Sequence, residues 1–222
     1  MTVLHLADEG EAADLAAFLS RLLHYDRGAA VRLQAAGTAL AVFGRPPSFD
    51  VLAIRAVRLA KPYENGLDAT LDVTVSAGEL LESVDETGAT AVVPKEVTGP
   101  PWAGVLPPRG GWRPVPGLPA SDALRAMVGA GVAEFRSRTG ELADERRTRA
   151  ELDRIGREIW SRTVGDTHLP VRAVHAAQSL GFLRAAGELA LLSSGAWLRL
   201  RTPYGSIAVR RAGLGALDVS VR

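Results

Sequence analysis

Apolar residues recur at helical spacing in several stretches of the chain, most clearly in residues 11–25, where large side chains fall at i, i+3, i+4, i+7 and i+8. Two capping boxes mark helix starts, one from Ser76 to Glu79 and one from Thr148 to Glu151. The predicted helices span residues 11–25, a short stretch after 76, 121–138, 149–163 and 170–180.

Short apolar strands follow the first and last of these helices, and the two groups of strands share one layout. Residues 29–56 and residues 187–212 each contain three predicted strands, with a small-residue turn that ends at Gly37 or at Gly195 and a later proline turn. A fourth strand of related sequence follows each group, "TLDVTVS" at 70–76 and "ALDVSVR" at 216–222. The repeated order predicts an internal duplication, although two unrelated β-meanders in an alanine-rich chain could also look alike.

These elements predict an α+β fold of two similar helix-plus-antiparallel-sheet units, joined by two helices and a Pro/Trp-rich loop. The predicted boundaries are 1–97 for the first unit, 98–119 for the loop and 120–222 for the second unit. Whether the two sheets merge or pack through helices stays open. The predicted core comprises Leu15, Phe18, Leu19, Leu22, Leu40, Val42, Leu52, Ile54, Val73, Leu124, Val128, Phe135, Leu152, Ile155, Ile159, Leu198, Leu200, Ile207 and Val209.

The connecting loop holds seven prolines and two tryptophans, an unusual composition for a plain linker. In one interpretation both indoles fold back onto the core and fix the loop between the halves. In the other, the loop is an aromatic-proline surface that contacts a partner. The candidate partner-binding residues are Trp102, Pro107, Arg109 and Trp112.

Composition limits the classes of protein to which the chain can belong. Hydrophobic residues make up 47% and charged residues 23% of the 222 residues, as in soluble globular proteins. Cysteine does not occur, which excludes disulfides and thiol nucleophiles. The chain starts without a basic segment and an apolar run, and no apolar stretch is long enough for a membrane span, so we expect a cytoplasmic protein.

Charge is distributed unevenly along the chain. Residues 1–110 carry a net charge of −5 and residues 111–222 a net charge of +6, so the halves can attract each other or a second copy, and the basic half can face a polyanion. Arginine outnumbers lysine 24 to 2, as GC-rich codons produce. The segments "AVFGRPPSFDVLAIR", "PPWAGVLPPRGGW" and "IGREIWSRTVGDTHLP" resemble a group of uncharacterised conserved proteins of high-GC actinobacteria, a resemblance that implies no fold, activity or site residue.

Sequence motifs of catalysis are few. The chain has no P-loop, no GxGxxG and no GxSxG motif, and its four histidines lack the spacing of a helical metal site. We therefore predict no cofactor and no metal. The leading hypothesis is a non-catalytic binding or scaffold protein that acts through protein contacts and forms a homodimer. A small-substrate enzyme with a site that the sequence does not reveal stays an alternative.

A nucleic-acid-binding regulator of winged-helix type is the second hypothesis. Helices 149–163 and 170–180 and the hairpin 196–211 follow each other in the order helix, recognition helix and wing. Guanidinium groups on such elements contact phosphates. The candidate residues are Arg172, Arg199, Arg201, Arg210 and Arg211. The recognition helix is poor in side chains that read bases, and a further predicted strand follows the hairpin, as in a sheet.

Overall fold

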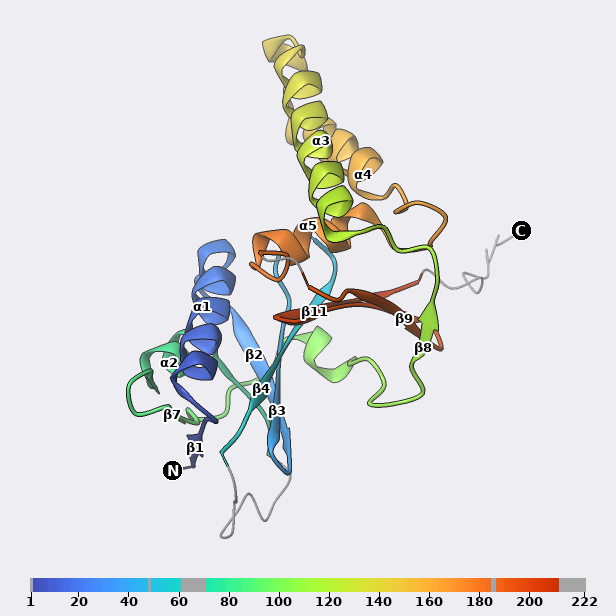
Figure 1. Cartoon of the computed structure of the whole chain (residues 1–222). Coiled ribbons are helices and arrows are strands. Elements are labelled where there is room, and N and C mark those ends of the chain that lie inside the picture. Colours follow the sequence, from blue (N-terminus) through green and yellow to red (C-terminus); the bar gives the residue numbers. More distant parts are fainter. Residues whose placement is uncertain (1, 48, 61–70, 185–186, 212–222) are drawn as a thin grey trace, which may run out of the picture.

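All five predicted α-helices are present in the computed structural model, which describes residues 2–47, 49–60, 71–184 and 187–211 (Figure 1). Ser76 and Thr148 each accept a hydrogen bond from the backbone N–H three residues later, as the capping boxes predict. The helices are α1 (Glu9–Tyr25), α2 (Ala77–Glu82), α3 (Ser121–Gly140), α4 (Arg149–Trp160) and α5 (Val171–Ser179), with two 3-10 turns, η1 (Pro101–Gly104) and η2 (Asp144–Arg146).

Eight strands form one antiparallel sheet in the order β5-β2-β3-β4-β11-β10-β9-β8. A second sheet of three short strands has the order β1-β7-β6. The strands are β1 (Val3–His5), β2 (Ala30–Ala36), β3 (Ala39–Gly44), β4 (Leu52–Arg58), β5 (Asp72–Ser76), β6 (Val84–Asp85), β7 (Thr90–Val92), β8 (Arg113–Val115), β9 (Ala190–Ser194), β10 (Trp197–Thr202) and β11 (Gly205–Arg210). The chain therefore has the predicted α+β architecture.

The large sheet contains the two similar units side by side. Helix α1 precedes β2, β3 and β4, and helix α5 precedes β9, β10 and β11, so the order of elements repeats. The units meet in reverse order where β4 pairs with β11, at the register Ile54 to Ser206. Gly37 and Gly195 have positive φ angles of 60° and 54° in the equivalent first turns. The two predicted sheets therefore merge into one at this β4–β11 seam.

The fourth strands of the predicted repeat differ between the units. β5 pairs with β2 at one edge of the sheet, and β8, from the Pro/Trp-rich loop, pairs with β9 at the other edge. The predicted strand at 216–222 lies outside the described residues.

The two faces of the large sheet are covered differently. Helices α1 and α5 pack on one face and form the main core, with Phe18, Leu40 and Leu200 among its buried residues. The other face carries a smaller buried cluster of Phe43, Leu52, Ile54 and Ala208, against which Trp102 and Leu106 of the connecting loop pack. The loop therefore packs on this face of the sheet.

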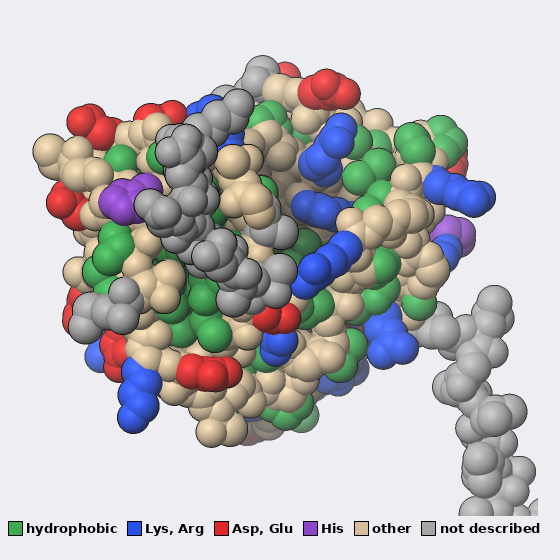
Figure 2. All heavy atoms as spheres, turned by 90° about the horizontal axis from the view of Figure 1, so that it is seen from below, with side chains coloured by type: hydrophobic (Ala, Val, Ile, Leu, Met, Phe, Trp, Pro, Cys, Tyr) green, Lys and Arg blue, Asp and Glu red, His purple; other side chains and the backbone are tan. Residues whose placement is uncertain are grey.

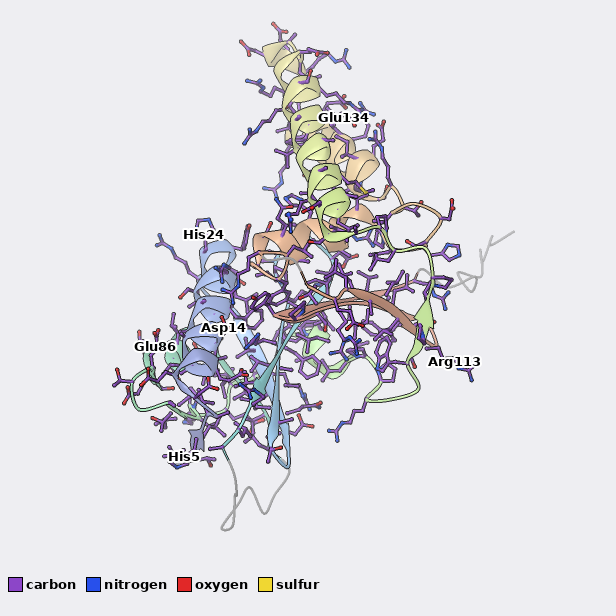
Figure 3. The ribbon with its side chains drawn as sticks, viewed as in Figure 1. His5, Asp14, His24, Glu86, Arg113 and Glu134 are labelled. Carbon is purple, nitrogen blue, oxygen red and sulfur yellow. The ribbon has the colours of Figure 1, made fainter. Side chains whose placement is uncertain are left out.

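A buried arginine on the helix-covered face of the sheet joins the two units. Arg55 of β4 donates from Nη2 to Glu11 Oε2 (2.9 Å) and Asp14 Oδ2 (3.2 Å), both on α1. Its Nη1 donates to the carbonyl oxygen of Tyr204 (2.8 Å) in the turn between β10 and β11. Arg184 also forms an ion pair with Asp14, which Figure 3 labels on α1. The guanidinium group of Arg184 lies over the Tyr204 ring. Charges from both units thus meet at one point.

Helices α3 and α4 form a hairpin, the α3–α4 hairpin, that projects from the sheet (Figure 1). Arg162 holds the carboxylate of Glu134 through two hydrogen bonds of 2.6 and 2.7 Å, and Arg138 holds Glu158 in the same two-pronged manner. Figure 3 labels Glu134 on α3. Arg162 lowers the pKa of Glu134 from 4.5 to about 2 through these hydrogen bonds. Ion pairs thus stabilise the hairpin.

The predicted core is buried apart from three residues. Val73, Phe135 and Leu152 are only half-buried. Val73 lies on β5, the last strand at one end of the sheet, where only an isolated bridge between Val75 and Glu96 adjoins the strand among the described residues. Phe135 and Leu152 belong to the apolar stripes of α3 and α4. These stripes extend beyond the part of the hairpin that α5 covers, so both side chains line a surface groove and are not part of the core.

The arginine-rich hairpin at 196–211 is not a projecting wing, so this part of the winged-helix hypothesis was wrong. Strands β10 and β11 lie inside the eight-stranded sheet, with β9 on one side and β4 on the other. The apolar run at 207–209 explains the difference, because a strand that is buried on both faces belongs inside a sheet.

Candidate functional site

A groove of about 700 Å³ lies at the base of the α3–α4 hairpin, and we call it the hairpin groove. Its volume falls in the range of about 300–1,000 Å³ that is typical of ligand pockets. Apolar rings and charged side chains from α3, α4, α5 and the β3–β4 turn line it together. The lining residues are Phe49, Asp50, Phe135, Leu152, Asp153, Gly156, Arg157, Trp160, Ser161, Arg172 and His175.

Local sequence places the apolar wall of the groove. Thr148 caps α4, and the helix then presents Leu152, Gly156 and Trp160 at intervals of four residues on one face. Trp160 lies close against Gly131 of α3, where an added Cβ would be 2.8 Å from the indole ring. Gly131 therefore allows the close helix contact that fixes the position of Trp160.

An aromatic floor continues from the wall. The His175 ring lies 4.3 Å from the Trp160 ring and 5.1 Å from the Phe49 ring, as measured between centroids. Burial among these rings lowers the pKa of His175, because desolvation disfavours the charged imidazolium. At neutral pH the floor of the groove is therefore uncharged.

The charged groups of the groove are not balanced. Both lining carboxylates are already paired within the chain, Asp50 with Arg45 at 2.6 Å and Asp153 with Arg149 at 3.8 Å. Within the described residues, the side chains of Arg157 and Arg172 have neither a hydrogen bond nor an ion pair, and Nε of Arg172 is buried without a partner. The groove thus offers two unpaired cations beside an apolar surface.

A second concentration of positive charge lies on the opposite side of the sheet, beside the connecting loop. We call this surface the basic face and define it by Arg109, Arg199, Arg201 and Arg210. Figure 2 views the molecule from below and shows basic side chains gathered to the right of its centre. Arg109 and Arg199 line a pocket of about 240 Å³, and Arg210 lines one of about 320 Å³.

Arg199 is the most enclosed member of the basic face. Its guanidinium carbon lies 5.7 Å from the centre of the Trp112 ring. Burial and, to a smaller extent, the charge of Arg201 lower the pKa of Arg199, and its Nε has no hydrogen-bond partner. Among described residues no carboxylate forms an ion pair with Arg109, Arg199 or Arg201, so this surface also favours an anion.

The candidate partner-binding residues of the loop have different surroundings. Trp102 is half-buried on the sheet and Pro107 is buried, whereas Arg109 is exposed. Trp112 is half-buried and donates from Nε1 to the carbonyl oxygen of Pro108 (3.0 Å). Trp102 and Pro107 therefore resemble the fixed loop of the first interpretation, and Arg109 belongs to the basic face.

The five arginines of the nucleic-acid hypothesis do not share one surface. Arg199, Arg201 and Arg210 lie on the loop side of the sheet, whereas Arg172 lies on α5 in the hairpin groove, across the sheet. The guanidinium group of Arg211 donates to the carbonyl oxygen of Gly195 (2.6 Å) and closes the β9–β10 turn. A single bound strand would therefore reach three of the five residues.

Most of the hairpin groove was not predicted from the sequence. Arg172 was singled out, but as a contact to DNA, and Phe135 and Leu152 were assigned to the core. Phe49 and Trp160 carried no functional signal as single aromatic residues. The apolar stripes of α3 and α4 were the available signal, because an apolar helix face predicts a surface that another segment covers.

Two other features, a metal site and a membrane span, are not present in the part of the chain that the structure describes. Among the described residues, no three His, Asp or Glu side chains are grouped so that they could hold a metal ion. In the same part of the chain, no helix combines the length and the apolar character of a membrane span.

Two family models match the chain, one for each half. Residues 1–104 match the domain of unknown function DUF8010, and residues 107–214 match the domain of unknown function DUF8185. No curated protein shows a significant match.

Solved structures of sliding clamps are similar in fold. The beta clamp of H. pylori in complex with 5-chloroisatin has a TM-score of 0.52 and 9% identity, and the match covers 98% of this chain and 65% of the clamp. The DNA polymerase sliding clamp of Pseudomonas aeruginosa has a TM-score of 0.49 and 11% identity, with 94% and 64% covered. The chain thus spans slightly less than two thirds of either clamp. Its two similar α+β units resemble the repeated units of the clamp fold.

Proposed function

We propose that this chain is a non-catalytic scaffold of clamp-like fold that binds a partner protein in the hairpin groove. One observation carries the proposal: the groove leaves Phe135, Leu152 and Trp160 half-buried beside two unpaired arginines. A protein segment that fills the groove would bury this apolar surface and pair these charges. The similarity in fold to the beta clamp of H. pylori supports a scaffold role.

The lining of the groove favours binding over catalysis. Its two carboxylates are held by arginines of the same chain, and its imidazole is enclosed between aromatic rings. General acid–base catalysis needs a titratable group within hydrogen-bond reach of the reacting proton. Asp50 already accepts a hydrogen bond from Arg45, and aromatic rings cover the imidazole.

Blocking the groove tests the proposal without removing any native contact. Gly156 lies on α4 in the groove, and a Cβ there would be 3.7 Å from Phe135, an ordinary contact. Gly156→Leu should fill the groove, and it should stabilise the helix because glycine is a poor helix former. Gly129→Leu on α3 is the matched control, since Gly129 is exposed with open space around it.

The measurement is affinity capture of partners from extracts of the source cells with the tagged full chain. A partner that binds the native protein and Gly129→Leu but not Gly156→Leu supports the proposal. Equal capture by all three proteins contradicts it. Thermal unfolding of each variant checks that both leucine variants are folded.

Nucleic-acid binding by the basic face is the second candidate function, and the three unpaired arginines Arg109, Arg199 and Arg201 favour it. Phosphate contacts make binding steeply dependent on salt. Binding of duplex DNA that weakens with salt and is lost in Arg201→Gln would support this function. Salt-independent binding, or binding unchanged in Arg201→Gln, would refute it.

Self-association is also part of the proposal, because the two halves carry opposite net charges. Sedimentation of the full chain at low and high salt measures it. A dimer that dissociates as salt rises supports electrostatic pairing of copies, and a monomer under both conditions contradicts it.

A further inference from the structure

We propose that the hairpin groove selects a short acidic segment of a partner protein that carries one large apolar side chain. This inference rests on the proposed function and specifies the partner's chemistry. It follows from three features of the groove: where its apolar surface lies, which of its charges are unpaired, and how much room it offers.

The apolar surface of the groove is arranged to receive one large side chain. Phe135 of α3 and Leu152 and Trp160 of α4 surround the space, and all three are half-buried although they belong to apolar helix stripes. Trp160 packs closely against Gly131 on one side, and its ring lies 4.3 Å from the His175 ring with the two planes tilted by 32°. A rigid, partly covered aromatic pocket of this kind is what an anchor residue occupies in a protein interface.

The charges beside the pocket favour carboxylates. Asp50 and Asp153 form exposed ion pairs with Arg45 and Arg149, and among the described residues neither carboxylate forms an ion pair with Arg157 or Arg172. Arg157 is exposed at the rim, and Arg172 is half-buried with its Nε enclosed and unpartnered. A buried donor without an acceptor is costly, and a carboxylate on the partner would satisfy it with a charge-assisted hydrogen bond.

The volume and the apolar wall favour a peptide. About 700 Å³ holds several residues of an extended or helical segment, which is more than one anchor side chain needs. The wall is made of aliphatic and aromatic groups, with Ser161 as the hydroxyl among the lining residues. A nucleic-acid phosphate could pair with the arginines but would leave this apolar wall uncovered. The acidic peptide is the occupant that uses both the wall and the arginines.

Selection from a random peptide library tests this inference directly. Heptapeptides displayed on phage are selected on the native full chain after removal of those that bind Gly156→Leu. The expected result is enrichment of sequences that place Asp or Glu next to Trp, Phe or Leu. Enrichment of basic or uncharged sequences overturns the inference, and so does the lack of any sequence that depends on the open groove.

The best-enriched peptide is then measured by fluorescence anisotropy on charge variants. Arg157→Gln and Arg172→Gln should each weaken binding about tenfold, because a charge-assisted hydrogen bond is lost. Arg136→Gln on α3 is the matched control, since Arg136 is exposed, has no ion pair among the described residues and does not line the groove. Equal effects of all three variants would mean long-range attraction only and would overturn the inference.

Other occupants give different results. Displacement of the peptide by single-stranded DNA would assign the groove to nucleic acid, and a dimer lost in Gly156→Leu would assign it to a second copy; either result overturns the inference. If the library fails while Gly156→Leu still loses its captured partner, the proposed function stands and only the acidic chemistry is wrong. If capture does not depend on Gly156, the proposed function itself fails.

Discussion

Replacing Arg55 by methionine should destabilise the protein by removing the charge that joins its two units. The Arg55 side chain is 7% exposed, and its partner Glu11 is 11% exposed. Methionine keeps the unbranched chain within the core but removes three hydrogen bonds, two to carboxylates of α1 and one to the Tyr204 carbonyl. The carboxylates then lose a buried counter-ion.

The size of the effect follows from the partners that remain. Removing one member of a buried ion pair costs about 3–5 kcal/mol when the other charge is left alone. In this cluster Glu11 keeps the Nε of Arg58 at 2.8 Å, and Asp14 keeps Arg184. The expected loss therefore lies at the lower end of that range, about 3 kcal/mol in the free energy of unfolding.

Urea unfolding, followed by circular dichroism, measures this loss. The matched control is Arg58→Met, which removes an arginine from the same strand and the same Glu11, but one that is 70% exposed. Solvent screens such a pair, so its midpoint should move much less than that of Arg55→Met. The m-value should stay constant in both variants. Equal midpoints for the two variants would refute the reasoning that burial makes Arg55 important.

Three further predictions concern packing and pH. Gly205→Ala should lower the free energy of unfolding by about 1–3 kcal/mol, because its Cβ would be 2.5 Å from the Phe182 ring, and Phe182→Leu should restore part of the loss in a double-mutant cycle. Because burial lowers the pKa of His175, stability should fall as pH drops below 6.5, until the lowered pKa is reached, and thermal scans of His175→Gln should show a flatter dependence. The Glu134 carboxyl should titrate near pH 2 by NMR, so its stabilising effect should be lost as pH falls from about 4.5 towards 2, and Arg162→Gln should raise this pKa. A titration near 4.5 in the native protein would contradict the two-pronged contact.

Local signals were sufficient to predict the helices and the repeated order of elements. Ser76 and Thr148 begin their helices as predicted because a cap depends on residues that are three apart in the chain. The α+β class followed from the same local patterns. The repeat was visible because the turns at Gly37 and Gly195 need the same backbone geometry.

Long-range pairing and the groove could not be predicted in this way. The two sheets merge because β4 pairs with β11, and these strands are about 150 positions apart in the chain. The periodicity of apolar residues does not specify such a long-range pairing. The runs at 52–54 and 207–209 are apolar at successive positions, a pattern typical of strands that are buried on both faces, but this pattern does not specify which strands pair. The groove depends on how far α5 extends under the α3–α4 hairpin. Because α5 does not cover Phe135 and Leu152, these predicted core residues line the groove instead.

The β4–β11 seam has a consequence for any attempt to divide the chain. A cut between residues 104 and 107, where the two family models meet, would leave β4 and β11 as bare terminal strands with open backbone donors and acceptors. Each fragment would then expose a strand edge that can pair with another chain. The two fragments should therefore associate when they are mixed, and each alone should aggregate. We therefore expect the two halves to fold as one cooperative unit.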